Sequence, residues 1–314
     1  MDEDYPRTLL ELEDRFRTED ACWAYLVRLR WPEGFRCPRC GHRKAWPLQR
    51  HRLFECSECA ALVSVTAGTI FHGSHLPLRV WFRAGWLVTN QKSGVSAAGL
   101  QRALGLGSYE TAWACLHKLR RAMIRPGRER LTEEVEVDEI FVGGVEPGGG
   151  KRHLGATKAL VAAAVEVRGA GMGRIRLRRI VNASAQSLEA FVQEAVEPGA
   201  RVITDGWTAY PGLERLGYVH RPRIVRTSGQ TASTLLPRVH RVAALLKRWL
   251  LGSHQGRVSR DHLGDYLDEF TFRFNRRLSR HRGKLFYRLL QQAVAIEPVP
   301  YQRLVATGSS HGHT

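Results

Sequence analysis

The chain of 314 residues is 43% hydrophobic, which suffices for one large domain or for two or three small ones. Lys and Arg number 48 against 30 Asp and Glu, and the net charge of +18 favours a polyanionic partner, first of all nucleic acid. No stretch approaches the roughly 18 apolar residues of a membrane span, and the acidic start is unlike a signal peptide, so we expect a cytoplasmic protein without a membrane partner.

The first expected element is helical. Apolar residues recur at helical spacing through residues 7–30, so the pattern predicts an N-terminal helical segment within residues 1–30. This segment begins acidic: residues 1–20 hold eight acids against three bases, whereas residues 218–288 hold sixteen bases against four acids. The basic surface is therefore expected in the C-terminal half of the chain.

Two Cys-x-x-Cys pairs follow. Cys37, Cys40, Cys56 and Cys59 are separated by 2, 15 and 2 residues, which is typical of a zinc site. Each pair forms a tight turn that directs two thiolates to one point, and four thiolates close a tetrahedral shell around Zn²⁺ with no open position. The spacing predicts a zinc ribbon over residues 31–75 that holds one structural zinc ion.

Residues 76–124 have helical periodicity that a turn interrupts. Gly105 and Gly107 mark this turn, and Ser108 is placed to cap the second helix at its N-terminus. These proportions predict a helix-turn-helix whose second helix enters the major groove of DNA. A plain helical hairpin with a basic solvent face is the alternative. The candidate DNA contacts on the second helix are Tyr109, Lys118, Arg120 and Arg121.

The periodicity changes after a linker at residues 125–130 that contains Pro and Gly. Stretches rich in Val and Ile predict three strands, then a helix and a fourth strand, and helical stretches follow down to residue 294. This order predicts an α/β domain over residues 132–296, with a mixed sheet flanked by helices. Residues 297–314 are expected to form a C-terminal tail.

Two aspartates interrupt the strand-forming stretches of this domain. Asp138 lies within "EVEVDEIFVGG", and Asp205 ends "RVITD" just before a glycine. A carboxylate on a buried strand is costly unless it is paired or binds a metal ion. Two carboxylates on neighbouring strands repel each other, and a divalent cation between them would relieve the repulsion. A salt bridge for Asp138 and a helix N-cap for Asp205 are the alternatives.

The helix predicted at residues 235–251 carries His240 and Lys247 on one side, because seven residues are almost two helical turns. We expect His240 to project away from the apolar stripe of this helix. That stripe comprises Val242, Leu245, Leu246 and Trp249.

These features together resemble a known family, the bacterial insertion-sequence transposases that join an N-terminal zinc ribbon to a DDE-type domain with an RNase H-like fold. The resemblance covers residues 20–295. It rests on the order of "FRCPRCG", "GLGSYETAWACLHKLRRAM", "VEVDEIFVGG", "ITDGWTAY", "PRVHRVAALLKRWL" and "YLDEFTFRFNRR". It implies an α/β, RNase H-like catalytic domain preceded by a zinc ribbon and a helix-turn-helix, in a bacterial protein associated with the nucleoid.

The resemblance implies a catalytic site for two Mg²⁺ or Mn²⁺ ions. Asp138 and Asp205 match the first two acids of the family's triad. The third acid of the family comes from a downstream helix and is commonly followed by Lys or Arg seven residues later. His240, followed by Lys247, takes this position with histidine where glutamate is usual, and Lys247 would contact a DNA phosphate. Glu269, which also has an arginine seven residues later, is the alternative third ligand, unless it forms an ordinary helical ion pair.

The activity implied by the resemblance is that of a DNA transposase. Such a protein binds terminal inverted repeats, cleaves the 3′ ends of the element with the help of metal ions, and joins these ends to target DNA. Cutting two ends in one event implies at least a homodimer on DNA. Two other classes stay open, namely a DNA-binding regulator with an inactive RNase H-like domain and an RNase H-like nuclease without strand transfer.

Overall fold

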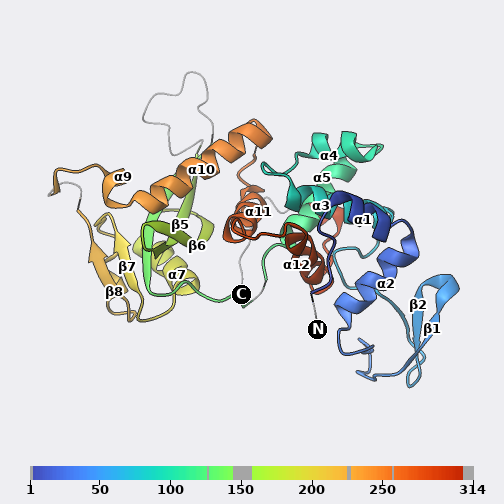
Figure 1. Ribbon diagram of the computed structural model, residues 1–314. Coiled ribbons are helices and arrows are strands. Elements are labelled where there is room, and N and C mark those ends of the chain that lie inside the picture. Colours follow the sequence, from blue (N-terminus) through green and yellow to red (C-terminus); the bar gives the residue numbers. More distant parts are fainter. Residues whose placement is uncertain (1–2, 126, 144–157, 225–227, 257, 307–314) are drawn as a thin grey trace. The chain divides into compact units, whose positions relative to one another are not determined.

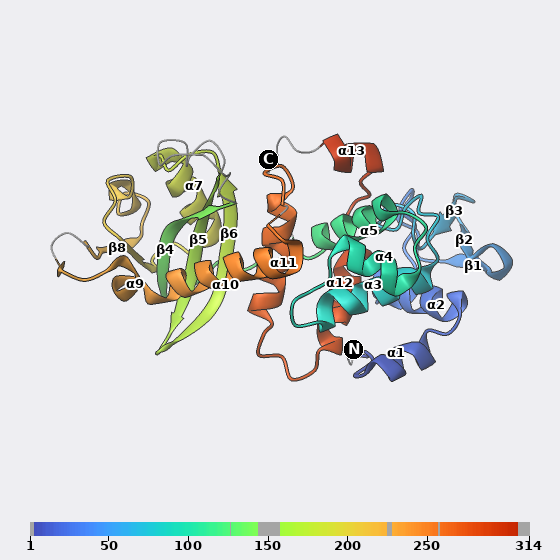
Figure 2. The same cartoon turned by 90° about the horizontal axis from the view of Figure 1, so that it is seen from above.

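The computed structural model describes residues 3–125, 127–143, 158–224, 228–256 and 258–306. These residues divide into two compact units (Figure 1 and Figure 2). The first unit contains the described residues up to Arg125 together with Leu278–Ala306, and the second contains those between Pro126 and Arg277.

The first unit is largely helical and includes a small ribbon of three strands. Strands β1 (Ala45–Leu48), β2 (Leu53–Cys56) and β3 (Leu62–Ser64) pair antiparallel in this order, and the 3-10 helix η1 (Gln49–His51) connects the first two. The helices of this unit are α1 (Leu9–Arg15), α2 (Glu19–Arg30), α3 (Leu78–Asn90), α4 (Ala97–Leu104), α5 (Tyr109–Arg121), α12 (Gly283–Ala293) and α13 (Tyr301–Ala306).

Local capping residues determine where several of these helices begin. Thr18 accepts a hydrogen bond from the backbone N–H of Ala21, which starts α2 as a helix separate from α1. Ser108 caps α5 in the same way, and Gly105 ends α4 with a left-handed φ of 62°. The predicted turn between two helices at residues 105–108 is therefore confirmed.

Helix α12 belongs to the first unit, which corrects the predicted end of the catalytic domain at residue 296. The ring of Phe286 packs edge to face against Phe82 and Trp86 of α3, at centroid distances of 5.7 and 5.8 Å. The sequence shows that α12 has an apolar face but not which distant helix covers it. The predicted tail contains helix α13, and its residues 307–314 lie outside the described part of the chain.

The second unit is built on a mixed sheet of five strands. Its strands are β4 (Glu134–Val142), β5 (Ala159–Arg168), β6 (Gly171–Ile180), β7 (Arg201–Thr204) and β8 (Val219–Pro222). The order across the sheet is β6-β5-β4-β7-β8, with β4, β5 and β6 antiparallel and β7 and β8 parallel to β4. Strand β8 was not expected, because its short and mostly exposed segment has no alternation of apolar and polar residues.

Helices cover both faces of this sheet, and Figure 2 shows α7 and α10 on opposite sides of it. Helices α10 (Pro237–His254) and α11 (Leu263–Asn275) share one apolar cluster with the sheet, and α7 (Ala185–Ala195) shares the other. Two short elements, η3 (Pro211–Leu213) and α9 (Ala232–Leu235), connect the larger ones. This arrangement confirms the predicted fold class, an RNase H-like α/β domain with a mixed sheet flanked by helices.

Candidate active site

Asp138 lies in β4, the middle strand of the five-stranded sheet. Side chains along a strand alternate between the two faces. Val137 packs in the cluster with α7, whereas Ile140 packs in the cluster with α10 and α11, so Asp138 faces α10. The residue paired with Asp138 on the neighbouring strand β5 is Ala163, whose small side chain leaves room on this face of the sheet. The Oδ1 atom of Asp138 accepts a hydrogen bond from the backbone N–H of Glu139 at 2.9 Å.

Helix α10 brings His240 to Asp138. The Nε2 atom of His240 lies 3.5 Å from the Oδ2 atom of Asp138. This ring nitrogen is buried, and it has no hydrogen-bond partner among the described residues. Buried polar atoms are almost always hydrogen-bonded or bound to an ion, so an unbonded nitrogen beside a carboxylate is suited to share a cation with it.

His240 lies at the side of the buried face of α10 and not opposite to it, which corrects the orientation expected from the sequence. The residues that α10 buries fully are Val239, Val242, Leu246 and Leu250. Because each residue advances the helix by about 100°, His240 follows Val239 at the edge of this stripe. The sequence alone does not distinguish these residues from Leu245 and Trp249, which are only partly buried.

Asp205 immediately follows β7, the strand that lies next to β4 in parallel. The register of these two strands extends to the pair Glu136 and Ile203, two positions before Asp138 and Asp205. The two aspartates therefore follow corresponding positions of adjacent strands. The Oδ1 atom of Asp205 accepts a hydrogen bond from the backbone N–H of Trp207 at 2.9 Å, which closes a turn and does not cap a helix.

The acids at this end of the sheet influence one another's ionisation. Burial raises the pKa of Asp138 to about 6, and the nearby charge of Asp205 contributes to the rise. Burial also raises the pKa of Glu139 to about 7, although a hydrogen bond from the Tyr210 hydroxyl opposes this rise. Within the described part of the chain, the ligand atoms of Asp138, Asp205 and His240 do not all lie within 4.8 Å of one another.

The donor atoms of this group fit a divalent cation. Carboxylate oxygens are the preferred ligands of Mg²⁺, and an imidazole nitrogen beside them is compatible with Mn²⁺. Burial is the largest cause of the raised pKa values of Asp138 and Glu139, and the negative charge of Asp205 adds to both. A bound cation would balance this charge and engage Nε2 of His240.

Glu269, the alternative third ligand, lies on α11. Its side chain is fully buried, and its Oε1 atom is 3.2 Å from Nη1 of Arg273, four residues later on the same helix. The charges that raise the pKa of Asp138 come from Asp205 and Glu136. The structure thus places His240 beside Asp138. Glu269 forms an ion pair with Arg273 on its own helix, which is the alternative to a ligand role given above.

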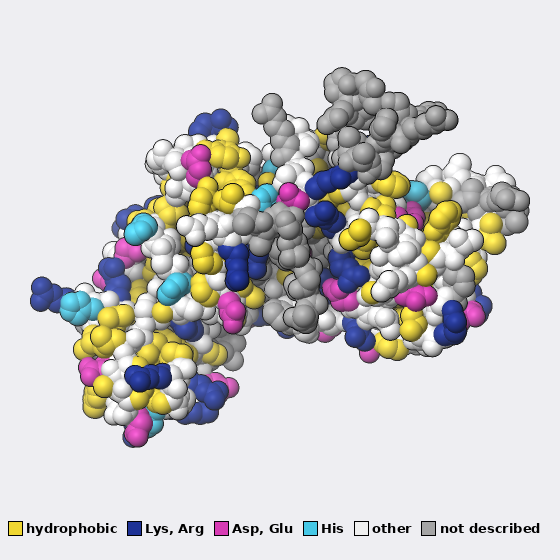
Figure 3. Space-filling model, turned by 180° about the vertical axis from the view of Figure 1, so that it is seen from behind, with side chains coloured by type: hydrophobic (Ala, Val, Ile, Leu, Met, Phe, Trp, Pro, Cys, Tyr) yellow, Lys and Arg dark blue, Asp and Glu magenta, His cyan; other side chains and the backbone are white. Residues whose placement is uncertain are grey.

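Lys247 is exposed on α10, on the same side of the helix as His240 and about 10 Å further along its axis. Arg241 and Arg248 are also exposed on this helix. Figure 3 shows one face of the molecule, on which Lys and Arg side chains are interspersed with apolar and acidic ones. On the described part of that face, the positive charge is not gathered in one uninterrupted patch.

The four cysteines of the ribbon converge as the spacing predicts. The Sγ atoms of Cys37 and Cys59 are 3.7 Å apart, those of Cys40 and Cys56 are 3.6 Å apart, and all four lie within 4.8 Å of one another. Sulfurs at about 2.3 Å from a tetrahedral zinc ion are about 3.8 Å from each other. Backbone N–H groups of Cys40 and Arg39 lower the pKa of Cys37 to about 6, whereas burial and the neighbouring thiols raise that of Cys40.

The candidate DNA contacts of α5 are not equally exposed. Tyr109 is exposed at the start of the helix, whereas Lys118 and Arg121 are half-buried. Arg120 is buried, and its Nη1 atom lies 3.4 Å from the ring of His117. It follows the buried Leu116 by four positions and so shares its face of the helix, which corrects the expectation that Arg120 is available to DNA.

Two known protein families match the chain. Residues 17–61 match the transposase zinc-ribbon domain, and residues 130–275 match the ISXO2-like transposase domain. Both matched regions are thus similar to domains of transposases. The chain is also 28% identical over 280 residues to an uncharacterized protein in transposable element ISH50 of Halobacterium salinarum. This alignment covers 82% of the present chain and 91% of the relative.

The transposase domain coincides closely with the second unit and contains Asp138, Asp205, His240 and Glu269. The transposase zinc ribbon begins at residue 17, earlier than the predicted residue 31, because it includes helix α2. No helix in the described ranges is long and apolar enough to cross a bilayer.

Sequence reasoning missed three polar side chains around Asp138. Glu136 is buried on the same face of β4, Glu139 is its half-buried neighbour, and Tyr210 donates a hydrogen bond to Glu139. The signal for Glu136 was present in "VEVDE", where it precedes Asp138 by two residues and therefore shares its side of the strand. The contact of Tyr210 has no signal in the sequence.

Proposed function

We propose that this protein is a DNA transposase that binds the terminal inverted repeats of its element, cleaves their 3′ ends and joins these ends to target DNA. The approach of His240 Nε2 to Asp138 Oδ2, at 3.5 Å, carries the proposal. Asp205 follows the neighbouring parallel strand at the corresponding position. These three side chains belong to the transposase domain and match, in order and spacing, an Asp-Asp-His form of the DDE-type site.

The chemistry assigned to the site is phosphodiester cleavage without a covalent enzyme intermediate. Two Mg²⁺ or Mn²⁺ ions at this site would activate a water molecule and stabilise the leaving oxygen during in-line attack on phosphate. Asp138 and Asp205 supply carboxylate oxygens from adjacent strands, and His240 supplies a neutral nitrogen from α10. The sheet and the buried face of α10 hold these groups in place, so the protein contributes position and charge.

DNA contacts in this proposal come from both units. Lys247 is exposed beyond His240 on α10 and would bind a phosphate near the reacting bond. In the zinc ribbon, Arg43, Lys44 and Trp46 are exposed along the segment that enters β1, which suits contact with the DNA backbone. On α5, the exposed Tyr109 is at the N-terminal end that a recognition helix presents to base edges.

Two ends of an element must be cut together, so the proposed active form is a homodimer or a higher oligomer assembled on DNA. In a cell it would act at the nucleoid.

The experiment uses a plasmid that carries the gene with its own flanking DNA, incubated with purified protein, Mg²⁺ or Mn²⁺ and a second target plasmid. New 3′ ends and joined products are mapped by sequencing. We expect the wild-type protein to produce both, and Asp138→Ala or Asp205→Ala to abolish both. DNA binding by these variants, measured by fluorescence anisotropy, is expected to stay within a few fold of the wild type because phosphate contacts dominate affinity.

Each other outcome identifies a different function. Binding without any metal-dependent cleavage would indicate a DNA-binding regulator with an inactive domain. Cleavage without joining would indicate a nuclease. Continued cleavage by either aspartate variant would show that the catalytic assignment is wrong.

A further inference from the structure

Glu136 is a buried carboxylate for which the proposed chemistry has no direct use. Its side chain is completely buried in β4, two residues before Asp138 on the same face. Its Oε2 atom accepts hydrogen bonds from the backbone N–H groups of Arg238 and Val239, at 2.8 and 3.0 Å. Its Oε1 atom accepts a third from the guanidinium of Arg238, at 2.9 Å. All three donors belong to the first turn of α10.

The first turn of α10 has no cap of its own. A helix leaves its first N–H groups without partners inside the helix, and a side chain just before the helix usually accepts them. Here that residue is Leu236, which offers no side-chain acceptor, and Pro237 has no N–H. The N–H of His240 bonds to the carbonyl of Leu236, so the two groups left over are those of Arg238 and Val239. Glu136 accepts both of them from the sheet.

This cap connects α10 to the strand that carries Asp138. Residues two apart on a strand lie about 6.6 Å from each other on one face. On the helix, the capped residues Arg238 and Val239 directly precede His240. The cap of Glu136 on α10 and the contact of Asp138 with His240 are therefore neighbouring links between the same strand and the same helix turn. A shift or rotation of α10 that breaks the first link changes the second.

Arg238 extends this connection to a second strand pair. Its side chain is only 18% exposed, and its guanidinium also donates hydrogen bonds to the backbone carbonyls of Gly169 and Gly171, in the turn between β5 and β6. The start of α10 is thus fixed at two places of the sheet, by Glu136 in β4 and by this turn.

We propose that Glu136 is a positioning residue that sets the place of His240 relative to Asp138 by capping α10 from the sheet. The inference rests on the proposed function, because it assigns a role in holding the metal-binding group of that function. Carboxylates that orient metal ligands without touching the metal typically contribute about 10- to 100-fold to metal affinity.

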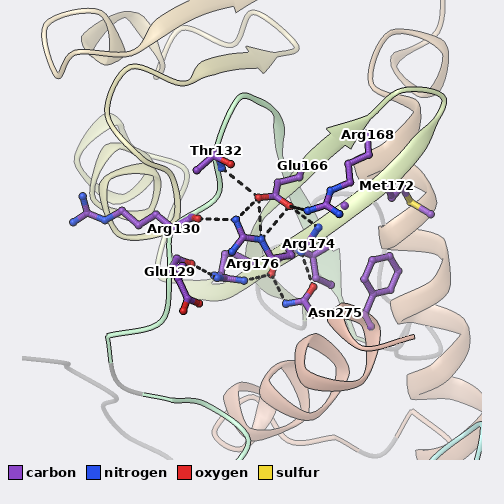
Figure 4. Close-up of polar contacts among 12 residues, drawn as sticks. Glu129, Arg130, Thr132, Glu166, Arg168, Met172, Arg174, Arg176 and Asn275 are labelled. Atoms are coloured by element: carbon purple, nitrogen blue, oxygen red, sulfur yellow. Dashed lines mark hydrogen bonds and ion pairs between the residues drawn. The ribbon is translucent and has the colours of Figure 1, made fainter. Parts of the chain in front are cut away.

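The chain provides a matched control in Glu166 of β5. Figure 4 shows this carboxylate, which is 3% exposed, among the backbone N–H groups of Thr132 and Arg174 and the guanidinium of Arg174. Like Glu136, Glu166 thus accepts from two backbone N–H groups and from one arginine, and Arg168 adds a longer ion pair at 3.8 Å. It lies opposite Val135 in the sheet, three positions before Asp138, and it does not contact α10 through these bonds.

The test measures Mn²⁺ affinity on the full chain with zinc in its ribbon, by electron paramagnetic resonance of free Mn²⁺. The site is identified as the Mn²⁺ binding that Asp138→Asn removes. We expect Glu136→Gln to weaken this binding by about 10- to 100-fold and Glu166→Gln to leave it within about twofold, although both lower the thermal unfolding temperature. Glu136→Asp keeps the charge but retracts the carboxylate by one methylene group, and we expect it to weaken binding as well.

Glu136→Asp separates positioning from charge, and it decides the test alone if Glu136→Gln does not fold. Wild-type affinity in Glu136→Asp would show that only the charge matters and would overturn the inference. Equal weakening by Glu166→Gln would overturn it too, because the effect would then be general destabilisation. If wild-type protein has no Asp138-dependent Mn²⁺ site, the proposed function fails first. If that site exists and the Glu136 variants bind as the wild type does, only the positioning role is wrong.

Discussion

The zinc site and the candidate active site of Asp138, Asp205 and His240, here called the acidic site, differ in how far apart in the sequence their metal-binding residues lie. The cysteines that bind zinc lie within 22 positions of the sequence, and their sulfur atoms already stand 3.6 to 3.7 Å apart in pairs. The acidic site takes Asp138 from β4, Asp205 from the end of β7 and His240 from α10. Asp138 and His240 approach to 3.5 Å, but the ligand atoms of the three residues do not all lie within 4.8 Å of one another. The cysteines are brought together by local turns of the chain. The distances among Asp138, Asp205 and His240 depend instead on how β4, β7 and α10 pack against one another.

The acidic site therefore depends on the packing of α10 against the sheet. Four fully buried aliphatic side chains of α10 contribute to one apolar cluster with β4, β5 and α11. Burying a side chain of this size stabilises the fold by about 1.5–3 kcal/mol. The hydrophobic effect behind this packing has little directionality, so it does not orient a polar side chain by itself. Directional bonds, such as those of Glu136 to the first turn of α10, are what can fix the position of His240.

The largest expected effect concerns zinc removal. The ribbon has three short strands and a very small apolar cluster, so its fold depends on the metal, whose binding to such modules has an apparent free energy of about 10–16 kcal/mol. We expect a chelator, or Cys56→Ser, to unfold β1 to β3 completely. Hydrogen exchange of the amides of these strands measures the effect.

The five-stranded sheet serves as the internal control in the same experiment. Its amides are expected to stay protected, because its two apolar clusters contain no zinc ligand. Loss of protection in β4 and β5 on zinc removal would contradict the view that the two metal-binding regions are built independently.

The next effect concerns the ligand role of His240. We expect His240→Ala to lower 3′-end cleavage by at least about 100-fold, because a lost metal ligand removes several kcal/mol of transition-state stabilisation. His240→Glu restores a ligand of the usual DDE type and is expected to recover most of this loss. Single-turnover cleavage of a labelled transposon end measures both. Equal activity of the two variants would show that His240 does not bind the metal ion.

Much of this difference between the two sites was accessible from the sequence. The spacing of four cysteines was sufficient for the zinc site, since the ligands lie on two local turns. The positions of Asp138 and Asp205 in strand-forming stretches indicated two acids on one sheet, and Asp205 does follow the strand beside that of Asp138. The family resemblance added His240, whose ring nitrogen lies 3.5 Å from Asp138. That the three residues share a metal site stays a prediction.

What the sequence did not contain is the identity of long-range partners. The sequence pattern places Glu136 on the same side of its strand as Asp138, but only the docked helix shows that it caps α10. Arg120 looks like an exposed base, but its face of α5 is the buried one. The apolar face of α12 is evident, but its packing on Phe82 and Trp86 of α3 depends on the fold. In each case the residue type is compatible with several environments, and tertiary packing selects one.

A smaller effect distinguishes Glu269 from His240. Because Glu269 is buried and paired with Arg273, we expect Glu269→Gln to destabilise the protein by about 1–3 kcal/mol. We expect the affinity of the Asp138-dependent Mn²⁺ site to stay within about twofold, since Asp138 contacts His240 instead. Urea unfolding and the Mn²⁺ titration described for Glu136 measure the two quantities. A large loss of Mn²⁺ affinity together with intact stability would make Glu269 the third ligand.

The smallest expected effect is the pH dependence that Glu166 gives to the sheet. Burial alone would raise the pKa of Glu166, but the hydrogen bonds and the charge of Arg174 outweigh burial and lower this pKa below its ordinary value of 4.5. A carboxylate whose pKa is lower in the folded state stabilises the fold above the unfolded-state value, and this contribution is lost as the pH falls through the folded-state value. The ion pair is therefore at full strength at neutral pH and fades below about pH 4.5.

We expect Glu166→Gln to lower the stability of the five-stranded sheet by about 1–2 kcal/mol at pH 7, and the gap to the wild type to narrow on acidification below pH 4.5. Hydrogen exchange of β5 and β6 in increasing urea, at pH 7 and near pH 4, measures this gap. A gap that does not change with pH would mean that Glu166 stabilises the sheet through shape and not through charge. The matched comparison with Glu136 would then need a control residue whose charge does contribute.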